Sequence, residues 1–513
     1  MNNKVNSSGI GWTALILVSL SSFIIALDST FMNVAITNLV VDLHTTVSVI
    51  QIIITVYALT MASLMLLGGK MQDVMGRKNA FLAGIIIYGI GTTVAALSIN
   101  STMLLIGWSI LEGVGAALMT PATASIITGT YSGKNRAFAI GIWTAIAGVG
   151  AAVGPLIGGF LTTFFSWRWG FGLELIIVLF VLALSGKLKY FPPSMKLSEL
   201  DRMSIILSSM GILILVLGIL SLNSIGNWEI APIMVGAGLL LLIIFYFREK
   251  KIINRNEKPL TDIRLFKNRN FTLGNITRLI MQLALAGAVF VLPVFLQFIT
   301  GADAFTTGLV ILPLTLGLLI FSIASSKISN YIAPHYMVSI GFLVAMAGTL
   351  FLRYQFNLNT QIADIVPGTF LLGIGLGLAL PVTGNIILSS VGADKQSDAS
   401  GIMSTSSNLG TSMGTAIIGI VLILGTINGI YMAVDQTFPN EFTKSEIKQN
   451  LTQYEQTMKT TNITGLKSNQ TSTAYTIVNT TISNAMRSAF DFVSLIFLIG
   501  FLISLYIRPM KEK

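Results

Sequence analysis

Residues 69–78 read GKMQDVMGRK and stand between two hydrophobic runs, 49–68 and 79–98. Each run has about the 20 mostly apolar residues that a helix needs to cross a bilayer. The two glycines of the short stretch tolerate backbone conformations that other residues avoid, and they allow a tight turn. The segment 49–98 therefore predicts two membrane-spanning helices joined by a short charged loop.

Hydrophobic runs of this length recur along nearly the whole chain. The predicted spans are 12–34, 49–68, 79–98, 102–125, 137–161, 170–187, 203–222, 231–248, 271–298, 305–325, 337–356, 363–388, 399–424 and 484–507. An even number of spans places both termini on the same side of the membrane. We therefore expect an all-α membrane protein with fourteen transmembrane helices.

The composition agrees with this fold class. Of the 513 residues, 53% are hydrophobic and 10% are charged, whereas soluble domains carry about 25% charged residues. A cleaved signal peptide is the alternative interpretation of the first run. That run is long, contains Asp28 and has no small-residue cleavage pattern.

The sequence carries no pattern of soluble-enzyme chemistry. It contains no cysteine, which excludes disulfides, thiolate metal sites and a cysteine nucleophile. It has no phosphate-binding loop, and its two histidines, His44 and His335, fall in predicted loops. We expect no enzymatic activity, no cofactor and no metal.

Lysine and arginine set the expected orientation, because cytoplasmic loops carry an excess of them. With the N-terminus inside, most of the 31 Lys and Arg residues fall in inner segments, and 248–271 is the richest. Both termini are then cytoplasmic, in a multi-pass protein of the plasma membrane. The net charge of +10 is a topology signal in this interpretation and does not indicate a nucleic-acid partner.

The longest outer segment is 425–483, which is polar and rich in Thr, Asn and Gln. Four Asn-x-Thr sequences begin at Asn450, Asn462, Asn469 and Asn479. Each is a glycosylation acceptor if the organism has that machinery. Chance matches in a Thr- and Asn-rich linker are the equal alternative.

Two stretches of the chain align with one another without a gap. The matched pairs are Gly113/Gly373, Gly115/Gly375, Pro121/Pro381, Thr123/Thr383, Gly141/Gly401, Gly150/Gly410, Gly154/Gly414 and Gly159/Gly419. Parallel repeats of this kind are a transporter architecture in which substrate binds near mid-membrane. We expect two six-helix bundles, 1–190 and 271–513, with two inserted helices and a basic cytoplasmic loop in 191–270.

The loop at 69–78 resembles the signature loop of the major facilitator superfamily, Gly-x-Leu-x-Asp-Arg-x-Gly-Arg-Lys. The resemblance implies a cytoplasmic charge network that locks one conformation, a conformational gate. The residues that match are Gly69, Asp73, Gly76, Arg77 and Lys78, while Val74 replaces an expected Arg. An ordinary positively charged inner loop is the alternative.

The fifth predicted helix carries Gly150, Gly154, Pro155, Gly158 and Gly159. Glycines at this spacing share one helix face and permit close backbone contact, and the proline bends the helix. The run resembles the antiporter motif of the same family, which marks exporters. Plain helix packing is the alternative.

Residues 27–35, LDSTFMNVA, are similar to a signature of the fourteen-helix drug:proton antiporter branch of this family. Two positions depart from the branch. Its Arg-x-x-Gln-Gly in the fourth helix is here Ser109-Ile-Leu-Glu112-Gly113, and Glu174 replaces its Asn in the sixth. The branch links the lost Arg to proton coupling, and an acid has appeared one turn away.

Three acids therefore lie inside predicted spans, where a charge costs roughly 2.5–3.5 kcal/mol at a helix centre. Glu112 is expected near the midplane, where a carboxyl can take up a proton because its charged form is poorly solvated. Asp28 is expected to attract cationic substrate or to carry a proton, and Glu174 to lie near the outer end. The alternatives are a satisfied buried acid for Glu112, a helix contact for Asp28 and simple solvation for Glu174.

These features predict a secondary active transporter that exports amphipathic or cationic small molecules in exchange for protons by alternating access. We expect a monomer whose partners are its substrate, protons and membrane lipids. The alternatives are an exporter of a specific metabolite, lipid or peptide, and a non-transporting membrane receptor or enzyme on the same fold.

Overall fold

The computed structural model describes residues 12–222, 229–329, 331–392, 395–437 and 472–509. Fourteen of its helices are long and apolar enough to cross a membrane, and the residues described contain no strand. The predicted fold class is therefore confirmed.

The spanning helices run in chain order as follows: α1 (Thr13–Val34), α3 (Val47–Met75), α4 (Arg77–Ala96), the continuous α5 (Ser101–Leu104), η1 (Leu105–Glu112) and α6 (Gly113–Thr130), α7 (Gly133–Phe164), α8 (Arg168–Leu184), α9 (Arg202–Ser221), α10 (Ala231–Asn254), α11 (Arg269–Val294), α12 (Ala304–Ile328), α13 (Pro334–Leu352), α14 (Ile362–Ser389), α15 (Gln396–Thr437) and α17 (Ser472–Ser504). The short helical pieces are α2 (Ile36–Asp42), η2 (Ser185–Lys187), η3 (Leu197–Glu199), η5 (Ile263–Lys267) and η6 (Phe295–Ile299).

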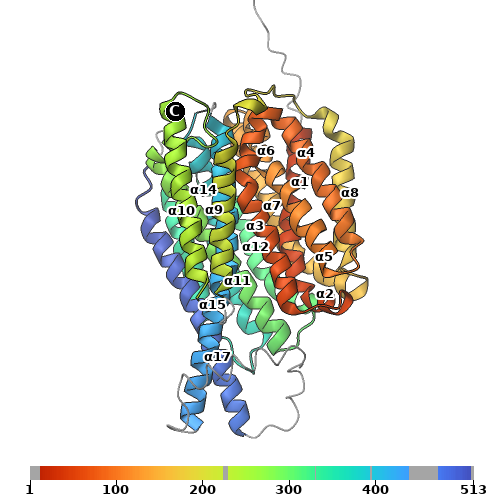
Figure 1. Ribbon diagram of the computed structural model, residues 1–513. Helices are drawn as coiled ribbons and strands as arrows, with labels where there is room; N and C mark the ends of the chain where they lie inside the picture. Colours follow the sequence, from red (N-terminus) through yellow and green to blue (C-terminus); the bar gives the residue numbers. More distant parts are fainter. Residues whose placement is uncertain (1–11, 223–228, 330, 393–394, 438–471, 510–513) are drawn as a thin grey trace, which may run out of the picture.

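The helices form two bundles, each with its own apolar core. One core cluster draws its buried residues from α1 to α8 and the segment just after it, and the other from α11 to α17. The pair α9 and α10 stands beside them (Figure 1), and α9 packs Ile212 and Val216 against Leu59 and Ala62 of α3. This is the predicted arrangement of two six-helix bundles with two inserted helices.

The internal repeat is visible as repeated contacts. In the first bundle, a Cβ added at Gly150 of α7 would collide with the carbonyl oxygen of Phe23 on α1. In the second bundle, a Cβ at Gly410 of α15 would collide with the carbonyl oxygen of Leu279 on α11. Matched glycines thus pack onto matched helices, as expected of parallel copies.

Two helices are longer than the sequence predicted. The spans were expected to end at residue 424 and to resume at 484, whereas α15 continues to Thr437 and α17 begins at Ser472. Their ends protrude together from one end of the molecule (Figure 1), and we call the paired ends, residues 425–437 and 472–483, the stalk. Gly, Thr and Asn residues interrupt the apolar runs at these points, so the sequence did not predict the extension. The two ends pack closely: a Cβ at Gly429 would lie 2.8 Å from Cα of Thr481.

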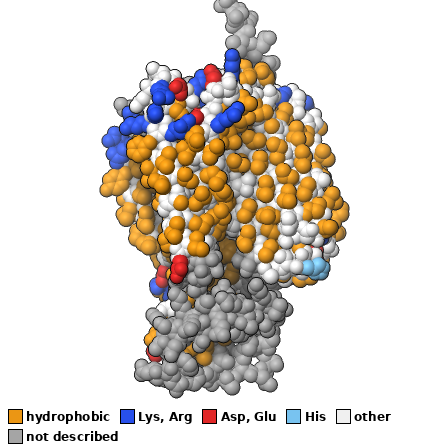
Figure 2. Space-filling view, in the orientation of Figure 1, with side chains coloured by type: hydrophobic (Ala, Val, Ile, Leu, Met, Phe, Trp, Pro, Cys, Tyr) orange, Lys and Arg blue, Asp and Glu red, His pale blue; other side chains and the backbone are white. Residues whose placement is uncertain are grey.

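Of the four Asn-x-Thr sequences in the outer segment, the structure describes only one. Asn450, Asn462 and Asn469 lie outside the described residues. Asn479 lies in α17, where its Oδ1 accepts a hydrogen bond from the Leu358 backbone N–H at 2.9 Å. At the opposite end of the molecule, Figure 2 shows Lys and Arg side chains gathered on the surface.

Candidate functional site

Three carboxyl groups from three helices of the first bundle lie together in its interior. Asp28 comes from α1, Glu112 from η1 and Glu174 from α8, and one oxygen of each lies within 4.8 Å of the others. All three side chains are fully buried. The sequence singled out each acid separately, and the structure brings them into one group, which we call the carboxyl cluster.

The helical segment η1 shapes the carboxyl cluster. It is π-helical, a rare conformation that is frequent at functional sites. Two glycines let it approach α4: a Cβ at Gly91 would lie 2.7 Å from Cγ of Glu112, and a Cβ at Gly107 would lie 2.6 Å from the backbone N of Ala95. Glu112 is thereby held against α4, inside the bundle.

Trp108 anchors Asp28. Its indole Nε1 donates to both carboxylate oxygens, at 2.8 Å to Oδ1 and 2.7 Å to Oδ2. The Tyr57 ring stacks on the indole with a centroid distance of 5.0 Å. Donors placed in this way stabilise a carboxylate, so Asp28 is the member of the cluster best suited to carry negative charge.

The other two acids have fewer donors. Glu174 Oε2 accepts from the Tyr88 hydroxyl at 3.1 Å. In the part of the chain that the structure describes, Glu174 Oε1 and both oxygens of Glu112 have no hydrogen bond of good geometry, although the hydroxyls of Thr92 and Tyr88 lie beside Glu112. Buried carboxylates without partners are costly, and three neighbouring ones repel each other.

This arrangement can relieve the repulsion by holding protons or a cation. Carboxylate oxygens are ligands that hard cations prefer, but Asp28 would first have to give up both contacts with Trp108. Protons need no such rearrangement, because Glu112 and Glu174 can take them on oxygens that have no hydrogen-bond donor.

The motif segment, residues 69–78, is not the expected loop: α3 continues to Met75 and α4 begins at Arg77, so Gly76 alone separates the two helices. Backbone contacts hold this segment against the residues that follow α8. Gly76 has φ of +83°, a conformation that favours glycine, and a Cβ there would collide with the Phe191 carbonyl oxygen. The backbone carbonyl of Asp73 accepts from the N–H groups of Ser194 and Met195 at 2.8 and 3.0 Å. The motif segment therefore contacts the residues that follow α8.

The two basic residues at the end of the motif segment donate to neighbouring carbonyl groups. Arg77 Nη1 donates to the backbone oxygen of Ser125 at 2.8 Å, and Lys78 Nζ donates to that of Leu188 at 3.3 Å. Both act within the first bundle in this conformation.

The start of the motif segment also contacts the second bundle. Lys70 Nζ lies 3.1 Å from Asp73 Oδ2 and 3.5 Å from Asp398 Oδ1 on α15. A Cβ at Gly69 would lie 2.9 Å from Cα of Gly401 on α15. We call this meeting point, at the end of the molecule opposite the stalk, the inter-bundle latch.

The glycine face of α7 packs on α1, the helix that carries Asp28. A Cβ at Gly154 would collide with the Thr30 hydroxyl, and a Cβ at Gly158 would lie 2.8 Å from a phenylalanine ring of α1. Pro155 and Gly159 are buried in the same helix. Any motion of α7 is thereby coupled mechanically to the helix that bears one acid of the cluster.

Sequence reasoning missed four participants: Trp108, Tyr88, Lys70 and Asp398. Only Trp108 left a signal, because it lies four residues before Glu112 and so near the same helix face. Tyr88 and Asp398 meet partners that are far away in sequence, and Lys70 contacts both its neighbour Asp73 and the distant Asp398.

The second bundle holds a partly buried cation, Arg278 of α11. Its guanidinium donates to Ser407 Oγ at 2.6 Å and to the Leu380 carbonyl at 3.3 Å. It forms no ion pair with the carboxyl cluster among the described contacts.

Comparison with known families gives a match to the Major Facilitator Superfamily over residues 18–415. Known proteins of similar sequence include the multidrug efflux pump LfrA of Mycolicibacterium smegmatis, 29% identical over 80% of both chains. The riboflavin transporter RibZ of Clostridioides difficile is 29% identical over 79% of this chain and 87% of its own length. The methyl viologen resistance protein SmvA of Salmonella typhimurium is 28% identical over 80% and 82%.

Among solved structures, the human organic anion transporter MFSD10 (TETRAN) is similar with a TM-score of 0.60. The match covers 96% of this chain and 98% of that chain at 12% sequence identity. At this identity the likeness concerns the fold alone.

Proposed function

The chain belongs to the major facilitator superfamily, and from this premise we propose that it exports amphipathic or cationic small molecules in exchange for protons by alternating access. The names of the similar proteins support export: one is a multidrug efflux pump and another confers resistance to methyl viologen. The substrate is moved and is not chemically altered.

The observation that carries the proton part of this proposal is the convergence of Asp28, Glu112 and Glu174. When the cluster is deprotonated its negative charge favours a cationic substrate in the same bundle. When Glu112 or Glu174 takes up a proton this attraction weakens and the substrate leaves. Linkage requires the reverse as well: a substrate that binds better to the deprotonated form must expel protons by the same factor.

The cluster is sealed in this conformation, so coupling needs a change that opens it. The packing of α7 on α1 and the inter-bundle latch offer that change. We propose that the latch of Lys70, Asp73 and Asp398 closes one end of the transporter, and that its release lets the bundles rock. The motif segment is held in place for this role by the contacts of Gly69, Gly76, Arg77 and Lys78.

The remaining topology is proposed on the same grounds. The bundles comprise residues 1–190 and 271–513, and the inserted unit is 191–270. Both termini are cytoplasmic, in a monomer of the plasma membrane that contacts lipids, and the stalk faces outward. Support comes from the Lys and Arg side chains that gather at the end away from the stalk (Figure 2).

A second candidate is export of one specific metabolite, which the similarity to a riboflavin transporter favours. A transport panel separates the two readings. Exchange of several unrelated cationic dyes supports the first, and exchange of one metabolite alone supports the second.

The proposal is tested in proteoliposomes with an imposed pH gradient and a cationic dye. Glu112→Gln and Glu174→Gln remove ionisable groups at similar volume, and we expect each to abolish uphill transport while downhill exchange of dye persists. Glu249→Gln is the matched control, since Glu249 is also fully buried but lies outside the cluster. Uphill transport at the normal rate in both cluster variants would show that the cluster carries no coupling proton.

A further inference from the structure

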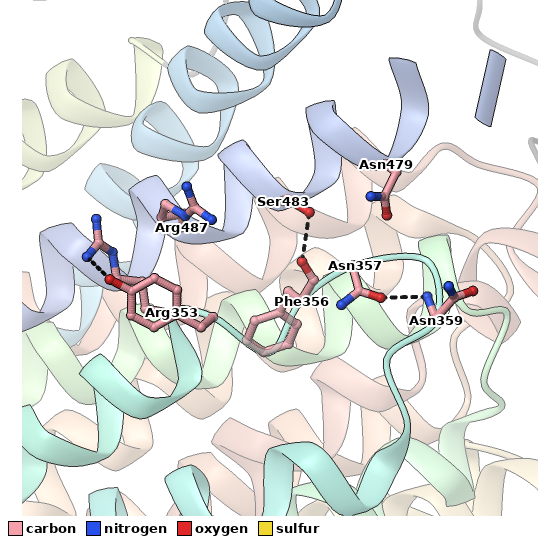
Figure 3. A pocket seen from close by; sticks show the side chains of 8 residues that line it. Arg353, Phe356, Asn357, Asn359, Asn479, Ser483 and Arg487 are labelled. Carbon is pink, nitrogen blue, oxygen red and sulfur yellow. Dashed lines mark hydrogen bonds between the residues drawn. The ribbon is translucent and has the colours of Figure 1, made fainter. Parts of the chain in front are cut away.

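A polar cavity of about 410 Å³ lies at the end of the molecule that bears the stalk. The connection between α13 and α14 forms one wall and the first turns of α17 form the other (Figure 3). Its lining residues are Arg353, Tyr354, Phe356, Asn357, Asn359, Asn479, Ser483 and Arg487. No role in the proposed transport cycle uses this cavity.

Two asparagine side chains at the cavity use their oxygens as hydrogen-bond acceptors, whereas the hydroxyl of Ser483 and Nη1 of Arg353 are spent as donors to Phe356 and Tyr354. Asn479 Oδ1 accepts from the Leu358 N–H at 2.9 Å, and Asn357 Oδ1 accepts from the Asn359 N–H at 2.8 Å. Since an amide side chain offers two N–H donors beside its oxygen, both asparagines keep donors for the interior. The cavity wall is therefore suited to a ligand rich in acceptors.

The arginine charges at the cavity also favour a ligand rich in acceptors. Arg353 Nε lies 2.6 Å from Asp491 Oδ1, so its charge is balanced. Arg487 stacks over the Tyr354 ring at 5.6 Å and forms no ion pair among the described contacts. Among the described residues no acid lines the cavity, and Arg487 is the cation on its wall that has no acidic partner there.

We propose that this cavity binds a phosphate group that carries a small polar substituent. A guanidinium and several N–H donors that converge on one space match the oxygens of a phosphate. The volume exceeds that of a bare ion, which leaves space for a substituent such as glycerol. Such a group is supplied either by the headgroup of an anionic lipid or by a free organic phosphate.

The position of the cavity favours the lipid source. Tyr354 is 64% exposed at the end of α13, and tyrosines concentrate where helices leave the hydrocarbon core. Arg353 and Arg487 flank this ring at 4.9 and 5.6 Å. Phosphates of a lipid leaflet lie at that level.

Thermal unfolding of the purified full chain tests the proposal. One arm titrates glycerol 3-phosphate in a neutral detergent, and the other compares nanodiscs of phosphatidylcholine with nanodiscs containing phosphatidylglycerol. We expect a saturable rise of the melting temperature in at least one arm. A rise with phosphatidylglycerol alone identifies a lipid headgroup, and a rise in both identifies the phosphate group itself.

Two substitutions make the test specific. Asn479→Asp keeps the acceptor for the Leu358 N–H but replaces the donors with negative charge, and Arg487→Gln removes the free guanidinium. We expect each to weaken the apparent affinity by about tenfold or more, since a charge-assisted hydrogen bond contributes roughly 1.5–3 kcal/mol.

Arg269→Gln is the matched control, because Arg269 also stacks over a tyrosine, Tyr506, at 5.7 Å. It should leave the response unchanged. The proposal is overturned if the wild-type protein shows no saturable rise in either arm, or if both site variants respond as the wild type does.

Discussion

Ser109 occupies the position where the related antiporters carry an arginine. Its hydroxyl donates to the Ile53 carbonyl on α3 at 2.6 Å and is fully buried. The residue before Ser109 is Trp108, whose indole N–H donates to the carboxylate of Asp28. The carboxylate of Asp28 is therefore stabilised in this chain by the indole N–H of Trp108.

Trp108→Phe tests this at single-residue resolution. The phenyl ring can still stack on Tyr57, but Asp28 loses both hydrogen bonds, each a charge-assisted contact of roughly 1.5–3 kcal/mol. We expect export in proteoliposomes to slow by about tenfold or more and its pH profile to move, with folded protein retained. Trp169→Phe, at an exposed position, is the control. An unchanged rate and pH profile in Trp108→Phe would remove Trp108 from the mechanism.

The identity of the three acids was predictable from sequence, but their meeting was not. An acid in an apolar run is a local signal, and each was found in this way. Their convergence depends on how α1, η1 and α8 pack, and on the widened π-helical turn that ends at Glu112. None of these features has a signature within the runs themselves.

At the scale of elements, the close contact of α7 with α1 limits what the glycine positions can accept. Gly154→Leu would push its side chain into Thr30 of α1. Overpacking of this kind costs about 1–3 kcal/mol, and we expect at least about a tenfold loss of export with reduced thermal stability. Gly236→Leu is the control, because a Cβ at Gly236 has nothing within 4 Å. Normal export by Gly154→Leu would reduce the motif to incidental glycines.

The inserted helices α9 and α10 are tied at one end by Asp201 and Arg248. Arg248 Nε and Nη2 each lie 2.6 Å from a carboxylate oxygen, and these bonds lower the pKa of Asp201 to about 2. A carboxyl with a lowered folded-state pKa stabilises the protein above its ordinary value of 3.8, and the contribution is lost as the pH falls toward 2.

Asp201→Ala should therefore lower the melting temperature at neutral pH. Part of the loss, about 1 kcal/mol, comes from the N-cap of α9, where Asp201 accepts from the Ser204 N–H at 3.1 Å. The difference from wild type should stay constant from about pH 8 to pH 5 and shrink at about pH 3. A difference that is the same at about pH 3 and pH 7 would mean that the ion pair adds nothing.

Element boundaries were predictable only where hydropathy marks them. The extension of α17 is rich in Ser and Thr, and that of α15 mixes apolar residues with Gly, Thr and Asn, so both were assigned to a loop. The two extensions pack closely at Gly429 and Thr481. A contact between segments so far apart in sequence cannot be predicted from either hydrophobic run alone.

In the whole molecule the two bundles contact each other at several places, among them the inter-bundle latch and the approach of Gly308 on α12 to the Pro155 carbonyl on α7. Asp398→Asn removes the charge that attracts Lys70, so we expect the bundles to separate more often at the latch. The chain has no cysteine, so in the double variant Asn79→Cys, Lys327→Cys spin labels attach to these two positions and to no others. Double electron–electron resonance should show a longer-distance population in Asp398→Asn than in the wild-type background. Identical distance distributions would contradict a gating role for the latch.

If substrate and protons compete through the carboxyl cluster, binding of a cationic dye must release protons, and this release can be measured directly. Purified protein in weakly buffered detergent solution receives a saturating cationic dye while a pH indicator is followed. Wild type should release protons on dye binding, because linkage is reciprocal. The double variant Glu112→Gln, Glu174→Gln resembles the protonated cluster, so it should bind dye more weakly and release no protons at a dye concentration that saturates it. Competition between dye and protons is ruled out if the double variant releases as many protons as wild type, or if wild type binds dye without any release.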